Sequence, residues 1–571
     1  MDIKEQANFI WSIADLLRGN FKQSEYGKVI LPFTVLRRFD CVLAPSKEEI
    51  LERNKSLAVS NKAPIFKKYT GHDYYNVSKF DFEKLIDDSN NIDTNLKDYI
   101  NGFSDDVKEI LDNFEIATII EKLKKAGLLY LVVQKFSEIN LGADTIDNLE
   151  MGYMFEELIR KFSEQSNETA GEHFTPREVI ELMVEVLLDT DLDEITTTDG
   201  KVITILDPAC GTGGMLSIAQ NKIRALNSRT TVVPFGQELN PETYATCKSD
   251  MILKNNTNSK IVFGNSFSED GFREQKFDYI LSNPPFGVEW KKVKNFIENE
   301  SKHKGYDGRF GAGTPRISDG SLLFLQHMIS KMQPIEKGGS RIGIVFNGSP
   351  LFSGDAGSGE SEIRKWIIEK DLLEAVIGLP DQLFYNTGIS TYVWILTNRK
   401  TDRRKGKIRL INGTSFFGKM RKSLGNKRNE ITESDRKEIV RLYSTYEHDE
   451  NYIDFDNDDF GYRKITLERP LYDENGKVAV DKKGNPKPDA KLRDTESVPF
   501  KEDIHEYFKR EVLPHAPDAW IDEKKTKIGY EIPFTRHFYK FTPLRESSVV
   551  LDEIKALEYE IQKVLNELFR D

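Results

Sequence analysis

The 571-residue sequence has few cysteines, no excess of positive charge and no long apolar run. Its three cysteines, Cys41, Cys210 and Cys247, are too few and too scattered to indicate a disulfide framework or a zinc site. No apolar segment approaches the roughly 18 residues that a membrane span needs, and no charged-then-apolar leader is recognisable, so we expect a cytoplasmic protein without membrane contact. The net charge of −12 differs from the basic charge typical of a nucleic-acid-binding protein. If the chain binds nucleic acid, the positive charge must come from a local segment or from a partner.

The length predicts several domains. At roughly 150 residues per domain the chain has room for three or four, and its 38% apolar content is sufficient to form their cores. Apolar residues at helical spacing predict an N-terminal helical domain over residues 1–145, and alternating strand and helix patterns predict an α/β domain over residues 146–400. A mixed region with a basic segment and an exposed hairpin follows over residues 401–545, and an amphipathic helix over residues 546–571.

A strand, a glycine-rich turn and a helix follow one another between residues 202 and 226. The apolar run 202–206 predicts a buried strand, and a helical stretch from 215 to 226 follows the turn. Glycines permit close backbone approach to a nucleotide, and the helix N-terminus offers free N–H groups, although a tight turn without a ligand would need the same glycines. The leading carboxylate favours a ligand with a positive charge. The candidate cofactor contacts are Asp207, Ala209, Gly211, Thr212, Gly213 and Gly214.

Two further polar residues end predicted strands downstream. Glu238 ends the strand 231–237, the position from which an acidic side chain holds a ribose diol in doubly wound folds. Asn265 follows the apolar run 261–263 and either meets an adenine ring or makes a plain turn. An adenosine with a positive centre and no phosphates satisfies this set of residues. S-adenosylmethionine fits that description, and we predict it as the cofactor.

The segment Asn283-Pro284-Pro285-Phe286 is the most informative in the chain. It follows the predicted strand 277–282, and its prolines end the strand and hold the backbone rigid. An amide oxygen, backbone carbonyls and one aromatic ring suit a planar group with an exocyclic NH2, because the acceptors take its hydrogens while the ring stacks on its face. The alternative is a proline-terminated strand whose asparagine makes a turn. We predict these four residues as catalytic.

These motifs, in this order, resemble those of the DNA adenine-N6 methyltransferases, and specifically the modification subunit of type I restriction-modification systems. The resemblance covers most of the chain and includes the upstream segment 171–177, which is similar to the family's extra cofactor-contacting motif. The same segment predicts a helix start with Thr175 as the cap, Pro176 at the first helical position and Glu178 at the third. As cofactor-binding candidates it adds Glu172, His173, Phe174, Thr175, Pro176 and Arg177.

The resemblance implies a fold and partners. The fold is that of S-adenosylmethionine-dependent methyltransferases, an α/β fold with a doubly wound, mostly parallel seven-stranded sheet, here with an N-terminal helical domain and a C-terminal helical tail. A short link at 386–388 would form a closing hairpin that supplies one antiparallel strand near an edge. The implied partners are double-stranded DNA and a specificity subunit that selects the target, with two modification subunits per specificity subunit. A restriction (nuclease and translocase) subunit is a further candidate partner.

On this interpretation the chain methylates N6 of an adenine. The amino nitrogen is a poor nucleophile, and acceptance of its two hydrogens by the Asn283 side chain and the Pro284 carbonyl would favour the pyramidal form that attacks the methyl group. The base must leave the duplex, with Phe286 stacking on it. Methylation of a glutamine side chain or of an RNA base amino group would need the same residues. A cofactor-binding assembly scaffold that is inactive alone is the remaining alternative.

Two more patterns concern charge and partner contact. Residues 399–428 contain twelve Lys or Arg against one acid, Asp402, and form either solvated loops or a phosphate contact. A second basic cluster, from Lys291 to Arg309, directly follows the catalytic segment, which favours a phosphate contact there. Apolar residues alternate spacings of four and three over residues 550–568, a seam of about 19 residues. This seam predicts a helix that packs either on its own domain or on helices of the specificity subunit.

Overall fold

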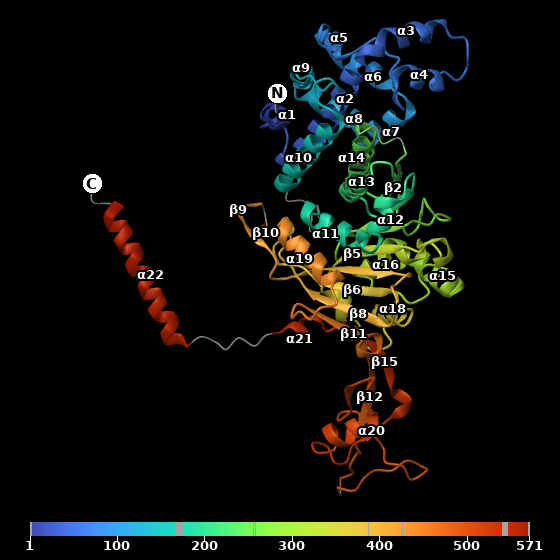
Figure 1. Ribbon diagram of the computed structural model, residues 1–571, viewed down its shortest axis with the longest axis vertical. Coiled ribbons are helices and arrows are strands. Elements are labelled where there is room, and N and C mark those ends of the chain that lie inside the picture. The colour runs from blue at the N-terminus through green and yellow to red at the C-terminus, as the bar shows by residue number, and fades with distance from the viewer. Residues whose placement is uncertain are drawn as a thin grey trace. The chain divides into compact units, whose positions relative to one another are not determined.

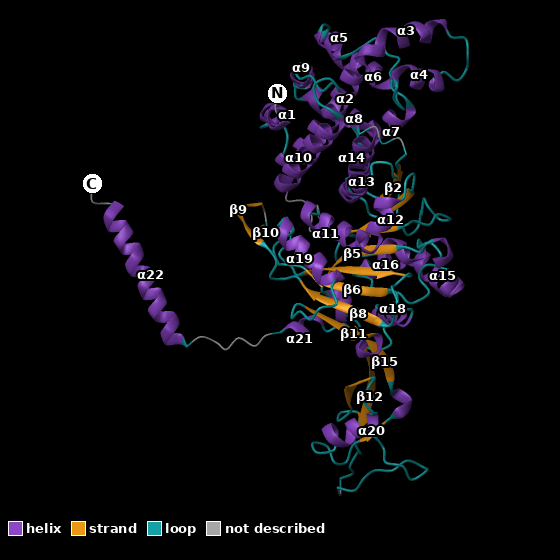
Figure 2. Ribbon diagram, viewed as in Figure 1, coloured by secondary structure: helices purple, strands orange, loops and turns teal. Residues whose placement is uncertain are grey.

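The structure is a computed structural model that describes residues 3–166, 175–539 and 546–568, apart from residues 255, 257, 386, 425 and 475. The chain divides into two compact units, residues 1–532 and residues 533–571, and Figures 1 and 2 show the elements of each. No helix in the described part of the chain is long and apolar enough to cross a membrane.

Helices α1 to α10 form a helical domain at the start of the first unit. Ile10, Ile13, Ile120 and Leu123 lie at helical spacing and are buried in one core, as their pattern predicts. The domain contacts the rest of the unit at α7, where Glu109 accepts hydrogen bonds from Tyr244 and Lys248 of α14, both at 2.6 Å. The helices are α1 (Ile3–Leu17), α2 (Tyr26–Leu43), α3 (Lys47–Ser56), α4 (Ala63–Thr70), α5 (Phe82–Ile86), α6 (Ile92–Asn101), α7 (Asp105–Asn113), α8 (Ile116–Lys125), α9 (Leu129–Ser137) and α10 (Asn148–Ser166).

A nine-stranded sheet follows, with the strand order β11-β8-β6-β7-β5-β4-β1-β2-β3. Strands β1 to β5 are parallel to one another, whereas β7 lies antiparallel between β5 and β6. Most residues of the central strands are buried, which is why those strands appear in the sequence as nearly continuous apolar runs. The strands are β1 (Val202–Asp207), β2 (Thr231–Glu238), β3 (Lys260–Phe263), β4 (Tyr279–Ser282), β5 (Arg341–Asn347), β6 (Leu373–Gly378), β7 (Thr391–Thr397), β8 (Lys407–Asn412) and β11 (Tyr452–Asp456).

The sheet confirms the predicted fold class and corrects its size. Seven strands, β3-β2-β1-β4-β5-β7-β6, form the predicted mostly parallel sheet, and the β6–β7 pair supplies the antiparallel strand. Strand β8 pairs in parallel with β6, and β11 pairs antiparallel with β8, so the sheet has nine strands and extends past residue 400. The sequence conceals β8 because it contains Arg409, which is buried and paired with Asp454 of β11 at 2.7 Å. A buried arginine breaks the apolar pattern of a strand.

Helices pack on this sheet around the glycine-rich turn. Helices α11, α13, α14 and α19 share one core with inward-facing strand residues such as Ile205, Leu281 and Val393. Helix α16 packs against β5. The helices of this region are α11 (Arg177–Leu188), α12 (Leu192–Thr197), α13 (Gly214–Leu226), α14 (Pro241–Leu253), α15 (Lys294–Lys304), α16 (Ser321–Ser330), α17 (Ser349–Phe352), α18 (Gly359–Glu369) and α19 (Glu433–Ser444).

Two smaller sheets complete the first unit. Strands β9 (Gly418–Leu424) and β10 (Lys427–Glu430) form an antiparallel hairpin outside the main sheet. Strand β12 (Gly461–Glu468) pairs with β13 (Asp494–Pro499), β14 (Trp520–Ile521) and β15 (Lys527–Tyr530), and α20 (Ile504–Tyr507) lies nearby in the sequence. Between β12 and β13 the chain makes isolated bridges, Tyr472 with Val478 and Val480 with Pro486, in the exposed region where a hairpin is predicted.

The second unit contains α21 (Phe534–Phe538) and α22 (Ser547–Leu568). Helix α22 confirms the helix predicted from the heptad spacing. The seam residues Val550, Ile554, Leu557, Ile561 and Val564 are between 37% and 59% exposed. Within the second unit, no described residue covers the seam.

Candidate active site

The predicted site residues come together at one edge of the sheet. Strands β1, β2, β3 and β4 are parallel, so their carboxyl ends lie at the same edge. Asp207 and Glu238 are the last residues of β1 and β2, Asn283 follows β4 directly, and Asn265 lies two residues after the end of β3. Strand β1 lies between β2 and β4, where the chain changes its direction of growth across the sheet. Ligands of open α/β sheets bind at such a switch point.

The turn after β1 holds its shape through backbone contacts and glycine conformations. Gly211 and Gly213 have positive φ angles of 52° and 84°, which favour glycine. A Cβ atom on Gly213 would lie 2.7 Å from Cys247 Sγ, so this position has no room for a side chain. Gly214 begins α13, so the N-terminus of this helix directly follows the turn. Thr212 lies half-buried within the same turn.

Glu238 supports this turn from the neighbouring strand. Its Oε2 accepts a hydrogen bond from the Gly211 backbone N–H at 2.8 Å, and its Oε1 accepts one from the Asn240 N–H at 2.7 Å. A carboxylate oxygen has more than one lone-pair site, so both oxygens retain capacity for a further donor such as a hydroxyl. Glu238 therefore fixes the turn and can still bind a diol.

Asp207 connects the turn to the catalytic segment. Its buried Oδ1 accepts hydrogen bonds from the Ala209 N–H at 3.0 Å and from the Ser282 hydroxyl at 2.8 Å. Ser282 immediately precedes Asn283. Burial raises the pKa of Asp207 to about 7; the two donors lower that pKa, and the charge of nearby Glu238 raises it. Asp207 is thus placed to change its charge when a cation binds beside it.

The loop after β3 carries Asn265 and is held in place by Arg309. The Asn265 Oδ1 accepts a hydrogen bond from the Phe267 N–H at 2.9 Å. The side chain therefore makes a turn, which is the second of the two roles predicted for this residue. Ser266 donates to the Pro208 carbonyl at 2.5 Å, and Arg309 donates to the carbonyls of Ser266 and Phe267 at 2.9 and 2.6 Å. Since Arg309 also pairs with Glu300 at 2.7 Å, it is a structural clamp and not the phosphate contact suggested by the basic cluster.

The catalytic segment is joined to the upstream motif by one hydrogen bond. Asn283 Nδ2 donates to the Thr175 hydroxyl at 2.9 Å. With the amide nitrogen engaged, the oxygen of the same amide, Oδ1, is buried and has no hydrogen-bond partner among the described residues. A buried acceptor without a donor is costly, and in a native protein it requires an explanation.

This hydrogen bond corrects the predicted helix start. Helix α11 begins at Arg177, and Pro176 is the capping residue, without a side-chain capping bond. Thr175 therefore does not cap the helix, because its hydroxyl is engaged by Asn283. Arg177 donates to Glu181 at 3.1 Å along α11. The other predicted contacts in this motif, Glu172, His173 and Phe174, lie outside the described residues.

The remaining residues of the catalytic segment form a rigid base for it. Pro284 and Phe286 are buried, and Pro285 is half-buried. The Phe286 ring meets the ring of Phe384 in an edge-to-face arrangement, with centroids 6.4 Å apart. The loop that carries Phe384 joins the strands of the β6–β7 hairpin.

Three residues at this edge are absent from the predicted site. Ser282 links Asp207 to Asn283, Phe384 packs on Phe286, and Lys427 contacts Glu178 in the first turn of α11. A serine next to the asparagine that is predicted to be catalytic is a usable sequence signal. For Phe384 and Lys427 no local pattern exists, because their contacts are long-range in the sequence.

Comparison with known proteins agrees with this geometry. The family described as N-6 DNA Methylase matches residues 147–464, and the family described as HsdM N-terminal domain matches residues 6–136. The chain is 26% identical over 487 residues to the type I restriction enzyme MjaIX methylase subunit of Methanocaldococcus jannaschii, covering 81% of this chain and 80% of that protein. It is 31% identical over 280 residues to the HindI methylase subunit of Haemophilus influenzae, covering 48% and 55% of the two chains.

A solved structure shares the fold. The type I restriction-modification methyltransferase subunit of Streptococcus thermophilus superposes with a TM-score of 0.65 at 22% identity, covering 81% of this chain and 97% of that one.

The fold is the α/β fold of that methyltransferase subunit, and the N-6 DNA methylase match makes this chain a methyltransferase. The chain belongs to the N-6 DNA methylase family, because the family match covers more than half of its length. The HsdM-type N-terminal domain confirms the resemblance to type I modification subunits. The prediction of an adenine-specific DNA methyltransferase is likewise confirmed.

Proposed function

We propose that this chain transfers a methyl group from S-adenosylmethionine to N6 of an adenine that has been flipped out of duplex DNA. The observation that carries the proposal is the buried Asn283 Oδ1, which has no partner among the described residues. An adenine amino group supplies the missing donor. Because Thr175 engages the amide nitrogen, the acceptor end of the amide is the one available to the base. Pro284 contributes its carbonyl, and Phe286 contributes a ring for stacking.

The residues at the ends of β1 and β2 suit the cofactor. Glu238 accepts from a ribose diol, the turn from Asp207 to Gly214 lies against the methionine moiety, and Asp207 faces the positive centre. Asn265 and the segment Thr175 to Arg177 remain candidate contacts from the adjoining loops. When bound, S-adenosylmethionine supplies an electrophilic methyl group on a sulfonium ion. Asn283 then acts by positioning the amino nitrogen and by stabilising the positive charge that develops on it.

We also propose that the target sequence is chosen by a specificity subunit. The exposed apolar seam of α22 in the second unit supports a contact with partner helices, because a single amphipathic stripe must be buried somewhere. Two copies of this chain per specificity subunit, and a restriction subunit joining that complex, complete the assembly. Purification of this chain from its source organism, followed by identification of the copurifying subunits and their ratio, tests this part.

The substrate class is tested by transfer of labelled methyl. We expect label from S-adenosylmethionine in N6-methyladenine of duplex DNA when the complex is assayed, and none in RNA or in protein glutamine. Label in RNA or in protein glutamine would contradict the proposal and support the corresponding alternative. Absence of transfer by the chain both alone and with its partners would favour the scaffold alternative.

A pH dependence of cofactor binding follows from Asp207, whose pKa is raised to about 7 by burial. A cation favours the ionised carboxylate, so affinity for S-adenosylmethionine is expected to increase by about tenfold between pH 6 and pH 8. Calorimetric titration across this range measures it, with Asp207→Asn as the control in which the dependence disappears. The folding stability of the unliganded chain depends on pH with the opposite sign. Because burial raises the pKa of Asp207, this carboxyl makes the folded state less stable as the pH rises from about 4 to about 7. A wild-type affinity that stays constant with pH would contradict the assignment.

Thr175 is expected to position the catalytic amide. Thr175→Val keeps the side-chain shape but removes the acceptor for Asn283 Nδ2, so the amide loses its fixed orientation. We expect kcat to fall by about tenfold while the Kd for S-adenosylmethionine changes little, and Thr175→Ser to retain most activity. Steady-state kinetics and equilibrium binding separate the two effects. A change confined to cofactor Kd would assign Thr175 to the cofactor instead.

A further inference from the structure

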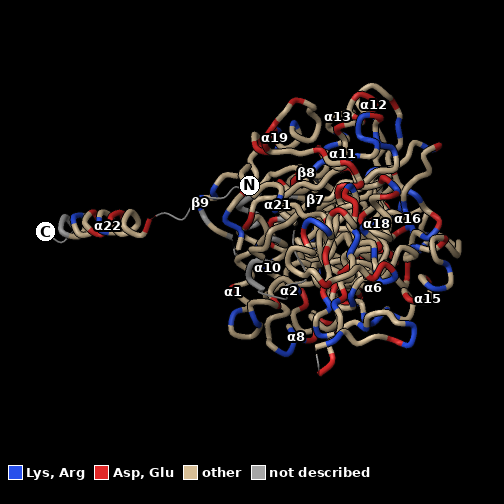
Figure 3. Tube along the Cα trace, turned by 90° about the horizontal axis from the view of Figure 1, so that it is seen from below, with Lys and Arg blue, Asp and Glu red and all other residues tan. Residues whose placement is uncertain are grey.

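The β9–β10 hairpin is strongly cationic. Residues 418–430 contain five Lys or Arg and one acid, Glu430. The side chains of Lys419, Arg421 and Arg428 are exposed, and no described acidic side chain forms an ion pair with any of them. In Figure 3, blue stretches mark basic residues along the β9 segment, at the periphery of the first unit.

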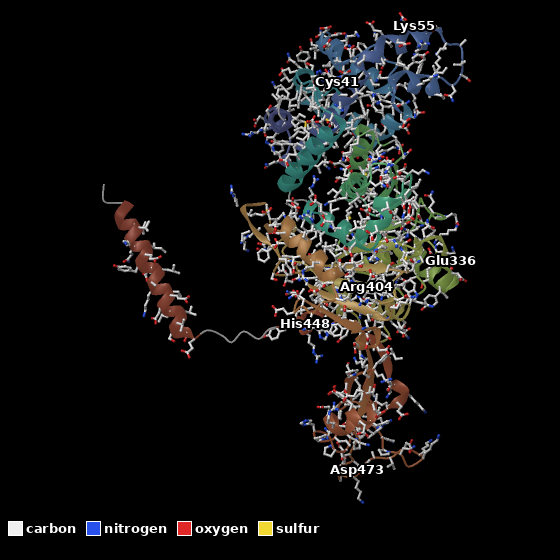
Figure 4. The ribbon with its side chains drawn as sticks, in the orientation of Figure 1. Cys41, Lys55, Glu336, Arg404, His448 and Asp473 are labelled. Atoms are coloured by element: carbon white, nitrogen blue, oxygen red, sulfur yellow. The ribbon has the colours of Figure 1, made fainter. Side chains whose placement is uncertain are left out.

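Four other cations of the basic segment have structural partners. Arg399 pairs with Asp191 at 2.6 Å, and Lys400 pairs with Asp371 at 2.6 Å. Arg404 is buried, lies near Glu374 and donates to the Tyr443 carbonyl; Figure 4 shows it within the body of the first unit. These cations serve the fold, as does Arg409 through its pair with Asp454. Lys419, Arg421 and Arg428 form no such ion pair with the described residues; Lys419 Nζ lies 5.1 Å from the centroid of the Phe417 ring.

Strand β10 and the turn before it are tied to the loop that joins β6 and β7. The Asn426 N–H donates to the Tyr385 carbonyl at 2.8 Å, and the Arg428 N–H donates to the Gln382 carbonyl at 2.9 Å. The Asn429 side chain donates to the Asp381 carbonyl at 2.7 Å. The hairpin is therefore bonded along β10 and its turn and keeps a defined position relative to that loop.

The same loop and strand β10 contact two elements of the candidate site. Phe384, within the loop, packs on Phe286 of the catalytic segment. Lys427, buried at the start of β10, donates to the Glu178 carboxylate and to the Leu383 carbonyl, the latter at 3.0 Å. Glu178 belongs to the first turn of α11, three residues after Thr175, which holds Asn283. The exposed cations are thus anchored to both elements that position Asn283 and Phe286.

We propose that the β9–β10 hairpin binds the phosphate backbone of the duplex beside the flipped adenine, through Lys419, Arg421 and Arg428. The inference rests on the proposed function, since it places the DNA relative to the catalytic segment. Duplex DNA is the partner whose charge matches an acid-poor cationic arm in a chain of net charge −12. Such contacts position the duplex and carry no sequence information, which agrees with target choice by another subunit.

The test is a charge reversal of the exposed cations. The complex is purified from the source organism through a tag on this chain, and its binding to a fluorescent duplex of about 30 base pairs is measured at several salt concentrations. We expect K419E/R421E/R428E to weaken binding by at least about tenfold at 0.1 M salt and to lower the slope of log Kd against log salt by about 2 to 3. The loss is expected to be equal for duplexes of different sequence, and cofactor affinity is expected to be unchanged. The neutral variant K419Q/R421Q/R428Q is expected to be intermediate.

A matched control carries the same charge change at the opposite edge of the sheet. R273E/K337E/K370E alters exposed residues that precede β4, β5 and β6, and we expect duplex binding within about twofold of wild type. If both hairpin variants bind the duplex with the Kd and the salt slope of the wild-type complex, the hairpin assignment is overturned and the proposed function is not affected. A wild-type complex that bound no duplex at all would overturn the proposed function as well.

Discussion

Replacing Asn283 with alanine is expected to lower kcat for DNA methylation by about 100- to 1,000-fold and to leave cofactor affinity unchanged. The physical reason is that the amide oxygen is the acceptor that positions the adenine amino group and stabilises its developing positive charge. Alanine removes this acceptor and also the donor to Thr175, without placing a new group at the end of β4. Single-turnover methylation of duplex DNA, together with equilibrium binding of S-adenosylmethionine, measures both quantities.

The control for this variant is another strand-end asparagine at the same edge. Asn412 ends β8, and its Oδ1 accepts a hydrogen bond from the Thr414 hydroxyl at 2.7 Å. Because β8 is separated from β4 by several strands, Asn412→Ala is expected to retain methylation within about threefold. If Asn283→Ala retained methyl transfer with cofactor bound, the catalytic assignment would be refuted.

Replacing Glu238 with alanine is expected to weaken S-adenosylmethionine binding by about 100-fold. The carboxylate makes two charge-assisted hydrogen bonds, to the Gly211 and Asn240 N–H groups, and would accept from the ribose diol in addition. Without it the glycine turn loses its support from β2 and the ligand loses its acceptor. Calorimetric titration of the cofactor gives the expected change directly.

Thermal unfolding of the unliganded chain separates the two roles of Glu238. A loss of affinity with little change in Tm indicates direct contact with the ribose, whereas a large drop in Tm indicates that the carboxylate acts through the turn. Glu238→Gln retains one acceptor oxygen and is expected to lose less affinity than alanine. Wild-type affinity in the alanine variant would exclude Glu238 from the cofactor site.

Much of this fold follows from local sequence pattern. The strands β1, β2, β4, β5, β6 and β7 are buried on both faces, so they appear as short apolar runs bounded by turn residues. Asp207, Glu238 and Asn283 end three of these runs, and the parallel direction of the strands is sufficient to bring them to one edge. Helix α22 is equally local, because its seam depends only on spacing along one helix.

Other features depend on contacts that no local pattern contains. Strand β8 is hidden by buried Arg409, whose charge is compensated by Asp454 from a different strand. Thr175 has the sequence context of a helix cap, but its hydroxyl bonds to Asn283, which lies 108 residues away. In both cases a distant residue supplies the partner, and local propensity is overridden.

The sequence by itself determined the family, the order of the strands along the chain and the residues that end them, because these depend on motifs and on apolar spacing. Only the tertiary structure decided which atoms those residues present. It left the Asn283 oxygen without a described partner, buried Asp207 so that its pKa rises to about 7, and divided one basic segment into structural ion pairs and an exposed hairpin. The reason is that burial and hydrogen-bond partners are set by elements far apart in the chain, and these determine what a charged or polar side chain can do.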